Sequence, residues 1–187
     1  MASNKVNLGI GLATGMFYTA SAGTALPSYP GDSTSLSGWT EVGAVTADGI
    51  TWSTGKDSDP IRNWAKEIER LVADEEGGTV SAPLMYTDKK TLEAIFGADN
   101  VTVTAANASH GGLVSVTVAP GVSSAPCGFL FIMKDGDDML MLGTEKGIIR
   151  DVEDISFSPT EAITWGCTIE AASWTFMKDD GQIASGS

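Results

Sequence analysis

Residues 40–53 read Thr-Glu-Val-Gly-Ala-Val-Thr-Ala-Asp-Gly-Ile-Thr-Trp-Ser. Two short runs of β-type residues flank the turn dipeptide Asp48-Gly49, and their apolar anchors are Val42, Val45, Ile50 and Trp52. Asp-Gly between such runs is typical of a tight turn, because glycine accepts the positive φ that the turn requires. The stretch therefore predicts a β-hairpin.

Composition bounds the rest of the chain. At 187 residues with 42% hydrophobic side chains, one folded domain with a sizeable core is expected. The 22 glycines fit many turns between short strands. A formal charge of −13 disfavours polyanion binding, and it is explained either by solubility or by a surface that must not hold nucleic acid.

Three upstream motifs accompany the opening stretch: Gly15-Met16-Phe17-Tyr18, Thr24-Ala25-Leu26-Pro27, and Trp39 four residues before Gly43. With the Asp-Gly-Ile turn, they resemble the start of the major tail protein, the tail tube subunit of long-tailed, siphovirus-type bacteriophages. In that family a short strand leads into a Thr-Ala-Leu-Pro loop, a Trp-x-x-x-Gly strand and an Asp-Gly-Ile hairpin. The resemblance extends to about Trp174.

Residues 61–76 support two interpretations. Trp64, Ile68, Leu71 and Val72 have helical spacing, so the periodicity alone predicts a helix. The family pattern implies a strand over about 68–74, and we adopt it because local propensity yields to context.

The α-helix we expect covers residues 88–96, within Thr87–Gly97. Thr87 or Asp88 can cap its start and Gly97 can close its end. Strands are expected over 13–19, 79–86 (with Pro83 at an edge or bulge), 101–104, 113–118, 128–133, 139–142, 147–150, 151–157 and 162–176. The fold class is therefore mainly β, a β-sandwich or barrel-like tail tube fold with one flanking helix and long loops and arms.

Few features indicate chemistry. Cys127 and Cys167 lie in apolar runs and read as buried thiols, with a bridge possible only between neighbouring strands. His110 is the single histidine and lies in a turn, and Asp135–Asp138 reads as a hairpin turn rather than a metal site. No phosphate loop, Cys/His cluster, nucleophile elbow or basic patch occurs, so we expect neither an enzyme nor a cofactor.

The predicted organisation is a single tail-tube-like domain over 1–187. It has an N-terminal arm (1–12), an extended loop (53–66) and a polar tail (177–187), and residues 107–126 could be an insertion displayed outside the tube. No segment approaches a membrane helix, and Ala20-Ser21-Ala22 follows too poor an apolar run for a signal peptide, so assembly in the host cytoplasm is expected.

The resemblance implies a virion protein that polymerises as stacked, hexameric rings into an acidic-lined conduit for genome ejection. Its partners would be further copies of itself, the tape measure, tail terminator and distal tail proteins, and DNA that passes without specific binding. Expected subunit and ring contacts are Val6, Leu8, Ile10, Asp57, Asp59 and Trp64. Candidate lumen-facing acids are Glu67, Glu69, Asp74, Glu75, Glu153, Asp154 and Glu170. The alternatives are a monomeric β-sandwich of the adhesin or carbohydrate-binding type and a hydrolase that pairs His110 with an aspartate.

Overall fold

The computed structural model of the chain describes residues 10–11, 16–30, 36–55, 58–62, 68–73, 77–119 and 124–179; for 10–11, 58–62 and 68–73 it describes the backbone path alone. Strands make up 46% and helices 9%, which confirms a mainly β, sandwich-like fold with one α-helix. The strands are β1 Ile10–Gly11, β2 Phe17–Ser21, β3 Thr40–Gly43, β4 Thr51–Ser53, β5 Ser58–Arg62, β6 Ile68–Ala73, β7 Thr79–Leu84, β8 Val101–Thr104, β9 Leu113–Val116, β10 Cys127–Asp135, β11 Asp138–Val152, β12 Trp165–Glu170 and β13 Thr175–Asp179. The helices are α1 Lys89–Phe96 and the 3-10 turn η2 Ala98–Asn100.

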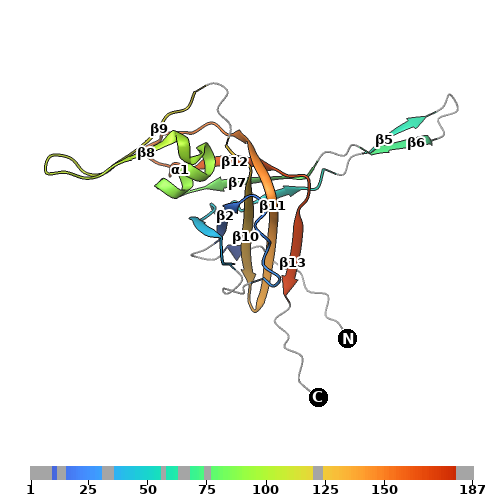
Figure 1. Cartoon of the computed structure of the whole chain (residues 1–187). Coiled ribbons are helices and arrows are strands. Elements are labelled where there is room, and N and C mark those ends of the chain that lie inside the picture. Colours follow the sequence, from blue (N-terminus) through green and yellow to red (C-terminus); the bar gives the residue numbers. More distant parts are fainter. Residues whose placement is uncertain are drawn as a thin grey trace, which may run out of the picture.

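The β10–β11 hairpin is the centre of the main sheet, whose strand order is β3-β2-β10-β11-β12-β7-β4 (Figure 1). Its turn is the predicted one, with Asp135 opposite Asp138 and Gly136 at φ 63°. Along β10, alternate side chains enter two different apolar clusters. Phe129 and Phe131 belong to the larger cluster, and Leu130 and Ile132 belong to the smaller one. Burial on both faces explains why this strand is a continuous apolar run.

Strand β11 is long enough to take part in two sheets. Its first half pairs with β10 on one side and with β13 on the other, through Met139–Gly143. Its last residues, from Ile148 to Val152, pair instead with β12, which leads on to β7 and β4. The sheet therefore turns along β11, and a register shift between Ile149 and Asp151 lies in this second half.

The larger cluster fills the space between the two halves of the sheet and α1. Phe17 stacks on Phe131 with ring centroids 4.8 Å apart, and both rings are fully buried. The helix adds Leu92 and Ile95 to this core, as its apolar spacing predicted. Its start is capped by Asp88, whose carboxylate accepts a 2.8 Å hydrogen bond from the Thr91 backbone N–H.

The smaller cluster lies on the opposite face of β10 and is covered by the loop between β2 and β3. Leu26, from the Thr-Ala-Leu-Pro motif, and Trp39 pack on it, and the Trp39 indole N–H donates to the Ala25 carbonyl at 3.2 Å. A Cβ at Gly143 would lie 2.7 Å from Leu26 Cδ2, so glycine leaves the space that Leu26 fills. The long loop is thus a structural cover for the sheet.

Two hairpins extend away from this body on opposite sides (Figure 1). One is β5–β6, in which Ser58 is opposite Ala73 and Arg62 is opposite Ile68. It confirms the strand over 68–73 and contradicts the helix that the spacing of Trp64, Ile68, Leu71 and Val72 favoured. The other is β8–β9, from Val101 opposite Val116 to Thr104 opposite Leu113.

The prediction of a hairpin over residues 40–53 is wrong in its pairing. The turn exists, with Gly49 at φ 75° and its N–H donating to Thr46 O at 3.0 Å. However, β3 pairs with β2, whereas β4 pairs with β7 at the other end of the sheet. The turn therefore connects the two ends of the strand order, since an Asp-Gly turn sets the local chain reversal and not which strands pair.

Three other predictions about strands need correction. Residues 162–176 form β12 and β13, separated at Ala171–Trp174, and both pair with β11. Of residues 151–157, the last five lie outside any strand. Pro83 lies in a strand with neighbours on both sides rather than at an edge or bulge, and its carbonyl accepts from the Thr46 N–H at 2.9 Å.

Candidate assembly surfaces

The main sheet has uncovered ends. Within the residues that the structure describes, β3 pairs with β2 alone and β4 with β7 alone. Strand β13 likewise pairs with β11 alone. Backbone N–H and C=O groups on the open side of such strands can accept another strand. These ends are positions at which a sheet can continue into another chain.

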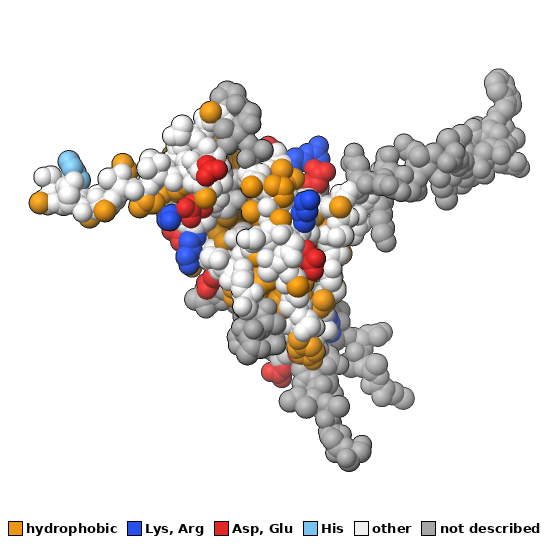
Figure 2. All heavy atoms as spheres, viewed as in Figure 1, with side chains coloured by type: hydrophobic (Ala, Val, Ile, Leu, Met, Phe, Trp, Pro, Cys, Tyr) orange, Lys and Arg blue, Asp and Glu red, His pale blue; other side chains and the backbone are white. Residues whose placement is uncertain are grey.

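The β8–β9 hairpin carries several exposed apolar side chains. Its side chains are largely exposed, with Val103 at 50%, Leu113 at 57% and Val114 at 39% of their full accessibility. Figure 2 shows hydrophobic side chains along this protrusion and no Asp, Glu, Lys or Arg on it. The clean alternation of its sequence predicted half-buried strands, and that prediction is wrong for the described part of the chain, where only Val101 and Val116 of the two strands are partly buried.

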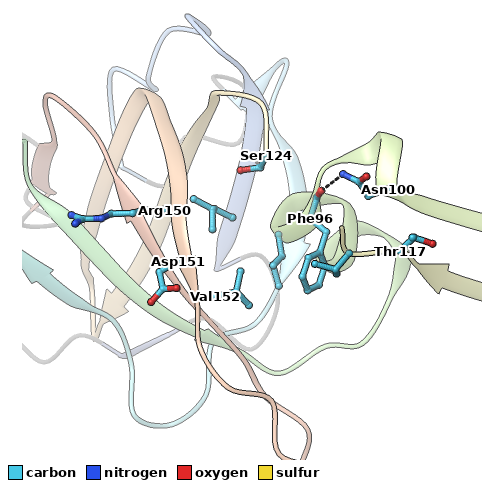
Figure 3. A pocket seen from close by; sticks show the side chains of 10 residues that line it. Phe96, Asn100, Thr117, Ser124, Arg150, Asp151 and Val152 are labelled. Carbon is cyan, nitrogen blue, oxygen red and sulfur yellow. Dashed lines mark hydrogen bonds between the residues drawn. The ribbon is translucent and has the colours of Figure 1, made fainter. Parts of the chain in front are cut away.

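A cavity of about 250 Å³ lies where the hairpin joins the body. Phe96 of α1, Thr117 after β9 and Val152 of β11 line it, and Arg150 points away from it (Figure 3). The side chain of Asn100 donates to the Phe96 carbonyl at 2.7 Å and closes the end of α1. The cavity wall is mixed, with as many polar as apolar residues, and Val101 and Val116 at the root of the hairpin pack against the core.

Three of the predicted lumen acids lie at the ends of β11 and β12: Glu153 and Asp154 directly follow β11, and Glu170 is the last residue of β12. The Glu153 backbone N–H donates to Gly166 O at 2.9 Å, and Asp154 follows it with an exposed side chain. Glu170, at the far end of β12, forms an ion pair with Arg150 in which Nη1 and Oε2 are 3.4 Å apart. Glu153 and Asp154 thus project negative charge, whereas the charge of Glu170 is partly balanced.

The buried thiol of Cys167 lies close to one of these acids, Glu153. Its burial, and secondarily the charge of Glu153, raises the pKa of Cys167 to about 12. Burial also raises the pKa of Cys127, which is half-buried. Both cysteines are free thiols, as the sequence predicted, and neither ionises near neutral pH.

The structure describes only two of the six predicted contact residues, Ile10 and Asp59. Ile10 lies in β1, whose backbone pairs with β10 of the same chain opposite Lys134. Asp59 lies in β5 opposite Val72. Outside the described residues lie Val6, Leu8, Asp57 and Trp64.

The first group of candidate acids is also only partly described. Glu69 lies within β6, where the backbone alone is described. Glu67, Asp74 and Glu75 lie outside the described residues. The roles proposed for them remain predictions.

Sequence reasoning missed the valines of β8–β9 as a candidate contact surface. The available signal was the absence of any Asp, Glu, Lys or Arg between Asp99 and Lys134, in a chain with a net charge of −13. Alternation predicts that one face of a strand is covered, and it does not show whether the cover belongs to the same chain.

The described part of the chain can be examined for a catalytic histidine, a metal site and a membrane-spanning helix. His110 lies at the exposed tip of the β8–β9 hairpin, where the Asn107 side chain accepts from its backbone N–H at 2.9 Å. Over the described ranges, no cluster of three or more His, Cys, Asp or Glu side chains could hold a metal ion. None of the helices there has the length and apolar character to cross a bilayer.

The described structure is a β-rich fold with open sheet ends and two projecting hairpins, in a chain with a net charge of −13, and it offers surfaces for contact with further chains. A family model of phage tail tube proteins matches residues 1–180. The chain belongs to the phage tail tube protein family and is a structural component of the phage tail. No curated protein matches it.

Proposed function

We propose that the chain polymerises as stacked hexameric rings into a hollow tube through which the genome is ejected. The observation that carries the proposal is the set of uncovered sheet ends at β3, β4 and β13, in a member of the tail tube family. Joining these ends between subunits pairs backbone groups that the described part of one chain leaves open, and it removes edges that would otherwise aggregate. A ring is the closed form of such joining.

The net charge fits a conduit for DNA. Six chains carry six times −13, a formal charge of −78. Acidic side chains that face the bore repel the DNA phosphates, so that the genome passes without adhering. Glu153 and Asp154 are the described acids we propose for the bore, and Glu67, Glu69, Asp74, Glu75 and Glu170 complete the proposed set.

The proposed partners follow from the same architecture. Rings stack on further rings through the N-terminal arm, including Val6, Leu8 and Ile10, and through the β5–β6 region with Asp57, Asp59 and Trp64. Tape measure, tail terminator and distal tail proteins define the inside and the two ends of the tube. Assembly takes place in the host cytoplasm, and the protein has a structural rather than an enzymatic role.

Electron microscopy of the purified chain tests the proposal. At high concentration, alone or with an initiating tail-tip complex, we expect hexameric rings or hollow tubes with a constant bore. A stable monomer under both conditions would contradict self-assembly and would favour a monomeric binding module instead.

The acidic bore is tested by charge reversal. We expect the double variant Glu153→Lys and Asp154→Lys to form tubes and to eject the genome more slowly, because lysines in the bore bind phosphates. Asp48→Lys, at the exposed turn between β3 and β4, is the control. Ejection followed by dye fluorescence should be unchanged in the control, and equal rates in all three proteins would remove these acids from the bore.

A further inference from the structure

The β8–β9 hairpin presents a face made only of valine. Val101 is opposite Val116 and Val103 is opposite Val114 in the antiparallel register. Because successive side chains of a strand point to opposite faces, these four valines share one face. The other face carries Thr102, Thr104 and Ser115 together with one exposed apolar residue, Leu113, which is opposite Thr104. The Ser115 hydroxyl donates to the Thr102 carbonyl at 3.4 Å.

The valine face is continuous with the core at one end and uncovered at the other. Val101 and Val116 pack against the main apolar cluster. Val103 and Val114, one step further out, are exposed at 50% and 39%. A two-stranded hairpin alone is marginally stable in water, and β-branched residues on one face favour packing against a further surface.

The charge pattern identifies the occupant of this face. Copies of a chain at −13 repel one another, so a contact between copies is favoured where like charges are absent. No Asp, Glu, Lys or Arg occurs between Asp99 and Lys134, a range that contains the whole hairpin, and His110 at its tip is the one histidine there. The hairpin is therefore a protrusion without acidic side chains and with an apolar valine face, on an acidic protein, and it is suited to a contact between identical chains.

We propose that the β8–β9 hairpin docks its valine face on a second copy of this chain and so links subunits of the assembly. The inference rests on the proposed function, since it names a contact within the tube. On this proposal the hairpin is part of the wall of the assembly and not an insertion displayed on its outside.

Paired lysine substitutions on the two faces of the hairpin test the proposal. We expect Val103→Lys with Val114→Lys to raise the concentration needed for assembly roughly tenfold or more, because a charge at a packed interface must be desolvated. The control is Thr102→Lys with Ser115→Lys, the neighbouring cross-strand pair, which adds the same charge to the same two strands on the other face. We expect the control to assemble at close to the wild-type concentration.

The readouts separate failure of this contact from failure of folding or of the proposed function. Thermal unfolding of the unassembled variants should match the wild type within a few degrees, because both sites lie outside the core of the body. Assembly of the valine variant at the wild-type concentration, or an equal loss in both variants, would overturn the docking proposal while leaving the tube intact. A wild-type chain that never assembles would overturn the proposed function itself.

A photo-cross-linking residue in place of Val103 identifies the occupant directly. In assembled wild-type-like tubes we expect a product with the mass of two chains, which peptide mapping assigns to two copies of this protein. A product formed only with another tail protein, or no product in intact tubes, would overturn the proposal.

Discussion

The β10–β11 and β8–β9 hairpins follow the same antiparallel geometry but differ in what lies beside them. Both faces of β10 are covered, one by the cluster around Phe17 and the other by Leu26 and Trp39. The outer half of β8–β9 has no such cover in the described part of the chain, and Val103 remains half-exposed.

This difference shows that an alternating or apolar pattern predicts a strand but does not predict which surface packs against it. In β10 the neighbour is another part of the same chain. In β8–β9, by the proposal above, it is a second chain. Stability of the subunit and stability of the assembly should therefore depend on different hairpins, and substitutions can separate them.

The largest expected effect is at the centre of the body. Phe131→Ala removes a fully buried ring that stacks on Phe17, and it should lower the free energy of unfolding by about 3–5 kcal/mol. The matched change in the exposed hairpin, Val103→Ala, should cost the unassembled chain less than about 0.5 kcal/mol. Urea unfolding of both variants measures the difference, and equal losses would mean that Val103 is covered within the single chain.

An intermediate effect is expected at a glycine beside the core. A Cβ at Gly77 would collide with the Ala171 carbonyl, so Gly77→Ala should destabilise the chain by about 1–3 kcal/mol through a forced backbone shift. At Gly111, in the tip of the β8–β9 hairpin, nothing lies within 4 Å of an added Cβ. Gly111→Ala is the control, and thermal unfolding should distinguish the two variants clearly.

The smallest expected effect is confined to the hairpin tip. The Asn107 side chain accepts hydrogen bonds from the backbone N–H groups of Ser109 and His110 at 2.8 and 2.9 Å. Asn107→Ala should cost at most about 1 kcal/mol, and only locally. Hydrogen exchange should accelerate at the amides of β8 and β9 and remain unchanged in β10. Faster exchange throughout the body would show that the two hairpins open together.

Local chemistry predicted several elements well. Asp88 and Gly97 at the two ends of an amphipathic stretch predicted α1, and Asp135–Asp138 predicted the β10–β11 turn. These elements depend on residues that are close in sequence. The strand at Ile68–Ala73 came from the family resemblance, because its own apolar spacing favours a helix.

Pairing between distant segments could not be predicted in the same way. The Asp48-Gly49 turn gives no information on whether its flanking runs pair with each other or, as found, with β2 and β7. For the assembly surfaces the missing information is of the same kind, since the partner of an edge or of the valine face lies outside a single chain.

Strand β11 has a mechanical consequence for a tube wall. It pairs with β10 and β13 along its first half and with β12 along its second, so one covalent backbone runs through both parts of the sheet. A pull applied to either part is carried to the other by covalent bonds rather than by a non-covalent seam between two layers. The subunit therefore resists shear as a single body, and in a wall of such subunits the joints between chains, not the chains themselves, are the places that give way.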